Sequence, residues 1–350
     1  MSIHPRRFGP APRDHLASQT TARLADVTLP PAPAFTAAAP HGRTITDGGL
    51  DIFLRSVPGP ADATPTWYIH GLEGSSRNWD RLAAVLAGVS AGYAPDLPGS
   101  GSSAPPRHPF SVADDARLVA RLIERSGGQP VHLVGNSRGG VVATVLAAQY
   151  PELVRTLTLI SPAVPDFRVV GERGASARLA LVMLPGAMGP LTRLLDSFAP
   201  DDRARGLALT CFGEPEKLSA EDIAAAAEDV AAHQTAPWAS ENAVRSLRSL
   251  IWAQLRPGKW SLATAARSVT RPTLVVWGTR DRLVDCRLAR RTASAFADSR
   301  LLMLERTGHV AQMERPVSVA RAMVALWEDD AACTRNAGAP VPSTCRVVGT

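Results

Sequence analysis

Several residue types are scarce in this chain of 350 residues, and each scarcity argues against a class of protein. Lysine occurs only at Lys217 and Lys259, so the net charge of +6 comes almost wholly from arginine. The arginines are scattered among acidic residues and form no basic run, which argues against a nucleic-acid-binding surface. Aromatic residues make up 5% of the chain, whereas 45% of it is hydrophobic. Such a chain can bury a large core, and its length predicts two domains or one large domain with an insertion.

Long apolar runs are also missing. The longest candidate, 179–191, is interrupted by Pro185 and Gly186, so we expect no transmembrane helix. We expect this segment to line a pocket or to pack inside the protein rather than to anchor it to a membrane. Arg6 and Arg7 near the N-terminus are followed by no apolar segment, so we expect neither a Sec nor a twin-arginine export signal.

The cysteines are few and lack a metal-binding pattern. The chain has four, at positions 211, 286, 333 and 345, and none is part of a C-x-x-C pair. Cys333 and Cys345 could pair in an oxidising compartment, but free thiols in a cytoplasmic protein are the favoured interpretation. We therefore expect a cytoplasmic protein without a structural metal.

The most informative stretch is a strand, a tight turn and a helix. The β-branched run 131–134 predicts a buried strand, and apolar residues at three- and four-residue spacing over 138–150 predict a helix. The turn at 135–139 reads G-N-S-R-G and fits the pattern G-x-S-x-G, in which small residues allow a serine to stand clear of the sheet on a strained backbone. Ser137 is therefore a candidate nucleophile. The backbone N–H of Arg138, at the start of the helix, is a candidate donor to an oxyanion.

Strands and helices alternate on both sides of this turn, which predicts an α/β fold with a mostly parallel sheet covered on both faces. Prolines interrupt every periodic segment of residues 1–42, so we expect an irregular N-terminal arm there. A β-hairpin is expected over 44–57, and the alternation stops at about residue 165 and resumes at about 268. Further strands are expected at 66–70, 91–96, 154–160, 273–277 and 300–304, and helices at 78–86, 111–125, 286–296 and 317–327.

The interval 165–267 is nearly all helical in pattern and reads as a lid over the carboxyl edge of the sheet. The expected organisation is therefore a core of residues 43–164 and 268–330, a helical lid at 165–267 and a tail at 331–350. Helices within the lid are expected at 175–183, 191–198, 219–232 and 241–255.

A serine nucleophile needs a base, and the base needs a carboxylate that orients it. Asp281 lies in the sequence W-G-T-R-D directly after the strand 273–277, and His309 lies in T-G-H after the strand 300–304. The order Ser137, Asp281, His309 and these three motifs resemble the α/β-hydrolase fold family over roughly residues 43–330.

The resemblance implies further site residues. His70-Gly71 resembles the H-G signature of the family, so the N–H of Leu72 is expected beside that of Arg138 in an oxyanion hole, with His70 itself in a structural role. Some members of the family carry the acid after the preceding strand, which makes Asp166 a rival to Asp281. Neither a metal nor an organic cofactor is implied.

A second glycine-rich motif imitates a nucleotide site. Residues 99–104 fit G-x-G-x-x-A after a strand, but Pro105 and Pro106 forbid the helix that a dinucleotide site requires. The stretch 96–103 instead resembles the D-x-x-G-x-G-x-S loop of the hydrolase family, so we expect no nucleotide.

The resemblance implies a serine hydrolase that cleaves a carboxylic ester in a small molecule through an acyl-enzyme. A serine nucleophile argues against the epoxide hydrolases and haloalkane dehalogenases of the same fold. Residues 135–137 and 308–314 also resemble carbon–carbon hydrolases of meta-cleavage products, although Val310 stands where those enzymes usually have tryptophan. Acyl transfer to an acceptor other than water and a ligand receptor with slow turnover stay open, and the oligomeric state is not predicted.

Overall fold

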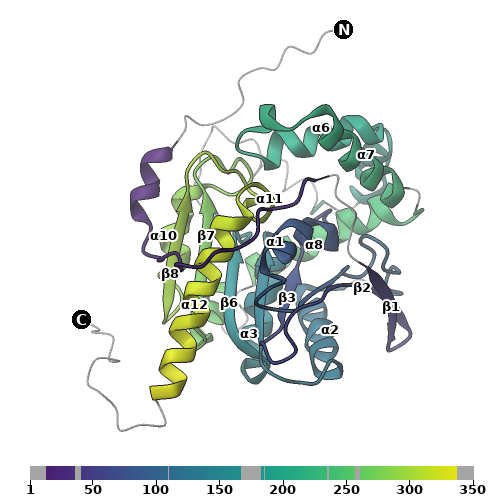
Figure 1. The fold of residues 1–350 in the computed structure, drawn as a ribbon. Helices are drawn as coiled ribbons and strands as arrows, with labels where there is room; N and C mark the ends of the chain where they lie inside the picture. The colour runs from purple at the N-terminus through teal and green to yellow at the C-terminus, as the bar shows by residue number, and fades with distance from the viewer. Residues whose placement is uncertain are drawn as a thin grey trace.

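The computed structural model describes residues 13–35, 41–108, 110–166, 183–184, 186–234, 236–256 and 261–336. An eight-stranded sheet runs through this part of the chain in the order β1-β2-β4-β3-β5-β6-β7-β8 (Figure 1). The β1–β2 and β2–β4 pairs are antiparallel and the others are parallel. The strands are β1 (Gly42–Asp47), β2 (Leu50–Val57), β3 (Thr66–Ile69), β4 (Gly92–Pro95), β5 (Val131–Asn136), β6 (Val154–Ile160), β7 (Thr273–Gly278) and β8 (Ser299–Leu304). The predicted mostly parallel α/β sheet is confirmed.

Helices cover both faces of the sheet. One buried cluster joins the sheet to α1 (Asp80–Leu86) and α12 (Pro316–Asn336). On the opposite face the sheet packs against α2 (Val112–Arg125), α3 (Arg138–Gln149) and α10 (Ala289–Ala293). Burial on both faces explains why β7 reads as a nearly continuous apolar run. Short elements complete the core: η2 (Ser76–Trp79), η3 (Pro151–Leu153), η6 (Cys286–Leu288) and α11 (Ala311–Glu314).

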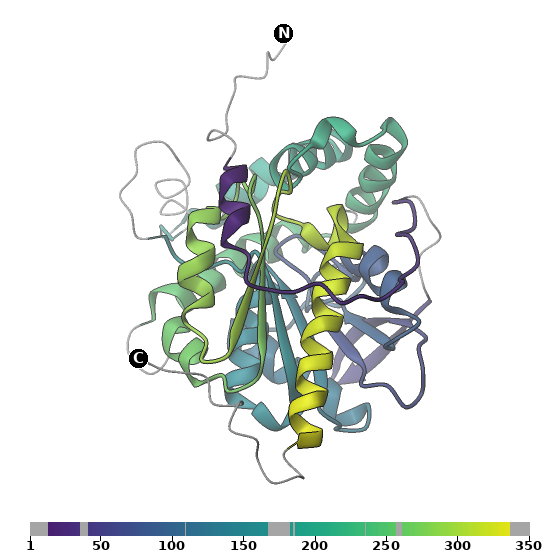
Figure 2. The ribbon, with the colours of Figure 1, turned by 60° about the vertical axis from the view of Figure 1, so that its left-hand side comes forward.

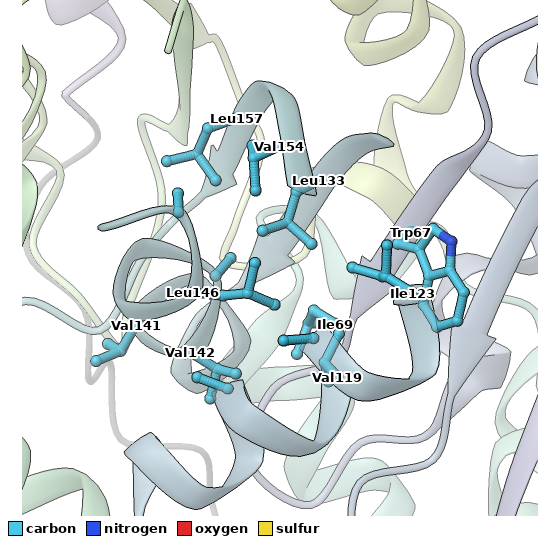
Figure 3. Close-up of a cluster of buried hydrophobic side chains, with 14 of the residues drawn as sticks. Trp67, Ile69, Val119, Ile123, Leu133, Val141, Val142, Leu146, Val154 and Leu157 are labelled. Atoms are coloured by element: carbon cyan, nitrogen blue, oxygen red, sulfur yellow. The ribbon is translucent and has the colours of Figure 1, made fainter. Parts of the chain in front are cut away.

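The largest apolar cluster lies beneath α2 and α3 (Figure 3). Side chains of α3, such as Val142 and Leu146, face Leu133 of β5, and Ile123 of α2 lies beside Trp67 of β3. These side chains are almost fully buried. The cluster anchors the end of β5 and the start of α3, and so fixes the turn between them.

The hairpin at the N-terminal edge of the sheet has the expected form. Asp47 pairs with Leu50 across a two-residue turn, in which Gly48 has a φ of 57° and Gly49 a φ of 79°. A turn with positive φ at both central residues matches the twist of the two strands, and glycine adopts that geometry without strain.

Between β6 and β7, the described residues from 186 to 268 are mostly helical, as expected, but the helices have different boundaries. The helices are α5 (Met188–Asp196), α6 (Pro200–Cys211), α7 (Ala220–Gln234), α8 (Ala239–Leu255) and α9 (Leu262–Ser268), with a short turn η4 (Pro215–Lys217). The sequence patterns indicated neither α6 nor α9, and the helix expected at 175–183 lies outside the described residues apart from residue 183. Figure 1 shows α6 and α7 side by side above one end of the sheet.

Residues 13–35 of the N-terminal arm are irregular apart from one short helix, and they pack on the sheet. The arm contains the 3-10 helix η1 (Asp14–Gln19), and Thr21 and Ala22 then donate backbone hydrogen bonds to Leu301 of the edge strand β8. Figure 2 shows the arm continuing across α12, where Ala25 donates to the carbonyl of Arg321. The arm thus covers the open edge of the sheet. At the other end of the chain, α12 runs to Asn336, into the segment expected to be a tail.

Candidate active site

Ser137 stands alone between the last residue of β5 and the first residue of α3. Its φ of 52° and ψ of −117° lie in a region that costs a residue with a side chain about 1–3 kcal/mol. Its N–H donates to the carbonyl of Ile160 at 3.0 Å, and its carbonyl accepts from Ala163 at 3.0 Å. A Cβ on Gly139 would overlap the carbonyl of Ile69, so glycine is required there. The packing around the turn therefore holds Ser137 in the sharp geometry that its motif predicted.

The loop after β3 lies against this serine. A Cβ added to Gly71 would stand 3.3 Å from the Cβ of Ser137. The next residue, Leu72, and Arg138 both line one small cavity. In the part of the chain that the structure describes, the backbone N–H groups of Leu72 and Arg138 donate to no acceptor. Both N–H groups are therefore candidates for the two donors of an oxyanion hole.

His70 has a structural environment, as expected. The N–H of Leu97 donates to its Nε2 at 2.9 Å, which requires an unprotonated nitrogen there. The proton then lies on Nδ1, which donates to the carbonyl of Gly71 at 2.8 Å. The ring thereby ties the loop after β4 to the loop that presents Leu72.

Asp281 and His309 meet at the carboxyl ends of β7 and β8. The Nδ1 of His309 lies 2.9 Å from Oδ2 of Asp281, and both side chains are buried. The other oxygen, Oδ1, accepts the N–H groups of Leu283 and Val284, each at 2.9 Å. Asp281 therefore presents a fixed acceptor to Nδ1, which leaves Nε2 as the ring nitrogen able to accept a proton. With Asp281 in this place, Asp166 is not needed to orient the histidine.

Asn136 links the turn to the histidine loop, a role that the sequence analysis did not assign. Its side-chain amide donates to the carbonyls of His309 and Ile160, at 3.1 and 3.0 Å. The residue before Ser137 thus holds the backbone of His309 at the same edge of the sheet. The motif G-N-S contained this residue, but the pattern alone does not reveal a partner 173 residues away.

The end of α6 also packs directly on the histidine loop. The N–H of His309 donates to the carbonyl of Cys211 at 2.6 Å. The half-buried carboxylate of Glu314 accepts the N–H of Gly213 at 2.9 Å and that of Gly308 at 2.7 Å. Glu314 therefore joins the helical block to the loop of His309, and the sequence analysis had quoted Glu314 without giving it a role.

We expect Glu314 to make folding stability pH-dependent near neutrality. Burial raises its pKa from the ordinary 4.5 to about 7, against the opposing effect of the two N–H donors and Arg315. The folded chain then holds this proton more tightly than the unfolded chain, so the contribution of Glu314 to the free energy of unfolding falls as pH rises from about 4.5 to about 7. Above that range the contribution stays constant.

Chemical denaturation of the wild type and Glu314→Gln across this pH range tests the expectation. The stability of the wild type relative to the variant should decline with rising pH up to about 7 and then level off. Glu305→Gln, which removes one exposed carboxylate from the loop before His309, is the matched control. A difference between wild type and Glu314→Gln that does not change with pH would contradict the assignment.

A second cavity, of about 160 Å³, lies beyond the first, and Arg138, Asn242 and Ser246 line both. It lies between α8 and the loop that precedes α2. The guanidinium of Arg138 forms a buried ion pair with Asp115 in its wall. Arg245 pairs with Glu241 at the same cavity. The charges of these two pairs are therefore neutralised within the wall, which also contains Arg107.

The loop that imitates a nucleotide motif is held by the protein itself. Asp96 accepts the N–H groups of Ser76 at 2.6 Å and Ser102 at 2.8 Å. A Cβ on Gly101 would overlap the carboxylate of Asp96, and the side chain of Asn242 donates to the carbonyls of Pro98 and Gly99. These glycines serve the packing of the loop. The described residues contain no group of three or more His, Cys, Asp or Glu side chains arranged to hold a metal ion.

Comparisons with known proteins agree with this architecture. A model of the α/β hydrolase fold matches residues 68–316. The chain is 28% identical over 248 residues to an uncharacterized protein of Mycobacterium tuberculosis, covering 69% of this chain and 68% of that protein. It is 24% identical over 278 residues to a monoacylglycerol lipase of Xenopus laevis, covering 75% of each.

Among solved structures, that of a bacterial membrane phospholipase A superposes with a TM-score of 0.67 at 25% identity, covering 83% of this chain and 86% of that one. Along the residues that the structure describes, no helix combines the length and the apolarity needed to cross a bilayer. The family model spans well over half of the chain, from β3 to the start of α12, and includes the loops that carry Ser137, Asp281 and His309. The chain belongs to the α/β-hydrolase family and is an enzyme.

Proposed function

We propose that this enzyme hydrolyses carboxylic esters through an acyl-enzyme formed on Ser137, with His309 as the base and Asp281 as the acid that orients it. The observation that carries the proposal is the 2.9 Å contact between Nδ1 of His309 and Asp281, at the sheet edge where Ser137 occupies its strained turn. We also propose that residues 165–267 form a lid over this edge, because the end of α6 packs on the loop of His309.

The reaction follows from the positions of the protons. Nε2 of His309 takes the proton of the Ser137 hydroxyl as Oγ attacks the ester carbonyl carbon. The N–H groups of Leu72 and Arg138 donate to the oxyanion of the tetrahedral intermediate. The imidazolium then returns its proton to the leaving alcohol. A water molecule repeats the sequence on the acyl-enzyme and releases the carboxylic acid.

Two arginines near the cavities are paired with carboxylates of the protein itself. Arg203 of α6 forms an ion pair with Glu73, which follows Leu72, and Arg245 of α8 pairs with Glu241. A carbon–carbon hydrolase would need an arginine free to bind the substrate carboxylate. Neither of these two arginines is free for that role, whereas Arg107, in the wall of the second cavity, has no ion pair among the described residues. The carbon–carbon alternative therefore rests on Arg107.

A series of p-nitrophenyl esters of increasing acyl length tests this function. Each methylene buried in an apolar pocket contributes about 0.8 kcal/mol, so kcat/KM should rise about fourfold per methylene until the pocket is full. We propose the second cavity, of about 160 Å³, as the acyl site, with Phe110 and Trp238 in its apolar wall, and expect the optimum at short to medium acyl chains.

The control substrate is a vinylogous diketo acid of the kind that meta-cleavage hydrolases cleave. Efficient cleavage of this compound, together with neutral esters turned over no faster by the wild type than by Ser137→Ala, would overturn ester hydrolysis in favour of carbon–carbon hydrolysis. Loss of that cleavage in Arg107→Gln, Arg203→Gln or Arg245→Gln would then identify the arginine that binds the carboxylate.

A further inference from the structure

The N-terminal arm contacts the two loops that carry Asp281 and His309. Asp14, the first residue of η1, lies against both of them. Its Oδ1 accepts a hydrogen bond from the hydroxyl of Thr279 at 2.5 Å and another from the N–H of Arg306 at 3.1 Å. Its Oδ2 accepts from the guanidinium of Arg280 at 3.2 Å. One carboxylate therefore bridges the loop after β7 and the loop after β8.

The two loops also contact each other at this point. Thr279 accepts the N–H of Arg306 at its hydroxyl, at 3.0 Å, while its own N–H donates to the carbonyl of Leu304. The N–H of Arg280 donates to the carbonyl of Thr307 at 2.8 Å. Thr279 and Arg280 directly precede Asp281, and Arg306 to Gly308 directly precede His309, so these contacts set the spacing between the two side chains.

Arg306, which belongs to this bridge, has a strained backbone. Its φ of 55° is unfavourable for a residue with a side chain, so its neighbours must hold its backbone in place. Its N–H is shared between Asp14 and Thr279, and its guanidinium pairs with Glu214 on the far side, just beyond α6. Loss of Asp14 would remove one of the partners that fix this strained residue.

The neighbouring residues of the arm fix Asp14 in turn. Arg13 forms an ion pair of 2.5 Å with Asp285, which is almost fully buried. Thr20 and Thr21 then join the arm to β8 through their hydroxyls, which accept the N–H groups of Met303 and Leu301. Burial opposes the charge of Asp14, but the hydrogen bonds from Thr279, Arg306 and Arg280 outweigh burial and lower the pKa of the carboxyl below its ordinary value. Asp14 is therefore a carboxylate at neutral pH.

We propose that Asp14 is a positioning residue, whose carboxylate clamps the loops of Asp281 and His309 at the spacing that catalysis requires, so that the N-terminal arm is part of the catalytic scaffold. The inference rests on the proposed roles of Asp281 and His309. Asp14 touches no reacting atom, and it acts through Thr279, Arg280 and Arg306.

Steady-state kinetics on the full chain test the clamp. Asp14→Ala removes every acceptor, and we expect kcat to fall about 10- to 100-fold because a misplacement of about 1 Å at the reacting groups has effects of this size. KM should change less than twofold, since the proposed substrate cavities contain no arm residue. Asp14→Asn keeps Oδ1 for Thr279 and Arg306 and should restore most of kcat.

Arg23→Ala is the matched control within the same arm. Arg23 pairs with Glu328 and Asp329 at the far end of α12 and contacts neither catalytic loop. Its loss should leave kcat unchanged. Thr279→Val, which removes the hydroxyl between Asp14 and Arg306, serves as a second variant if Asp14→Ala does not fold, and it should lower kcat in the same way. An unchanged kcat in Asp14→Ala, or an equal loss in Arg23→Ala, would overturn the proposal.

Hydrogen exchange separates this proposal from the proposed function. Amide protection over residues 279–284 and 305–309 should fall in Asp14→Ala and remain in Arg23→Ala, whatever substrate the enzyme takes. Unchanged protection in an enzyme that does hydrolyse esters through Ser137 would overturn the clamp alone. If Asp14→Ala loses protection but the wild type hydrolyses no ester, the clamp would be retained and the ester assignment overturned.

Discussion

Ser137→Ala is expected to lower kcat for ester hydrolysis by about 10⁶, the scale observed when a catalytic serine is removed from a hydrolase triad. The methyl group cannot attack a carbonyl or form an acyl-enzyme, so only the oxyanion donors and substrate binding remain to accelerate the reaction. The fold should survive, because alanine tolerates the φ of 52° no worse than serine does. A fluorophosphonate probe should label the wild type once and leave this variant unlabelled.

Ser161→Ala is the matched control for that experiment. Ser161 follows the neighbouring strand β6, also has a positive φ, of 44°, and is fully buried. Its hydroxyl has no hydrogen-bond partner among the described residues. We expect this variant to be labelled and to turn over substrate as the wild type does. Labelling that persists in Ser137→Ala and disappears in Ser161→Ala would overturn the assignment of the nucleophile.

The second large effect is expected at Asp281. Asp281→Asn should lower kcat about 10⁴-fold with little change in fold. The amide oxygen can still accept the N–H groups of Leu283 and Val284, but its NH₂ group would face Nδ1 of His309. His309 would then take the tautomer with its proton on Nε2, which cannot accept the proton of Ser137.

Asp166→Asn provides the comparison, because Asp166 follows β6 at the same edge of the sheet. We expect it to leave kcat within about twofold of the wild type. The pH dependence of kcat, together with circular dichroism of both variants, separates a changed tautomer from a damaged fold. If Asp166→Asn caused the large loss and Asp281→Asn did not, the acid would have to be reassigned.

The backbone and the side chain of Arg138 have different roles. Its backbone N–H lies at the start of α3 beside Ser137, while its guanidinium is buried against Asp115 of α2. A buried ion pair loses much of its attraction to the cost of desolvation, and burial accordingly raises the pKa of Asp115 although Arg138 opposes that effect. The pair fixes the relation of α2 to α3 just where the turn must remain strained.

Much of the architecture could be predicted from local pattern. The period of apolar residues located β5 and α3, and proline and glycine marked the ends of many elements. The helix expected at 111–125 forms as α2, and at its start the side chains of Ser111 and Asp114 each accept the backbone N–H of the other. The turn at Ser137 could be recognised because the small residues that it requires lie within the five positions 135–139.

The helices between β6 and β7 were predicted less well, because some of them lack a clear periodic pattern of apolar residues. In α6 the sequence places Pro200 at the first turn and Gly206 inside the helix, and Gly206 weakens the periodic signal. Its C-terminal end packs against the loop of His309, where Cys211 accepts the backbone N–H of that histidine. A contact between residues far apart in the sequence leaves no periodic pattern.

The sequence by itself determined the alternation of strands and helices, the turn that holds Ser137, and the order in which serine, acid and histidine follow one another. Only the tertiary structure decided which acid meets Nδ1 of His309, since Asp166 and Asp281 both follow parallel strands. It also decided that Glu314 joins the helical block to the histidine loop and that Asp14 joins the arm to both catalytic loops. Local pattern depends on sterics and burial along a few residues, whereas these pairings depend on how loops from separate strands converge at one edge of a twisted sheet.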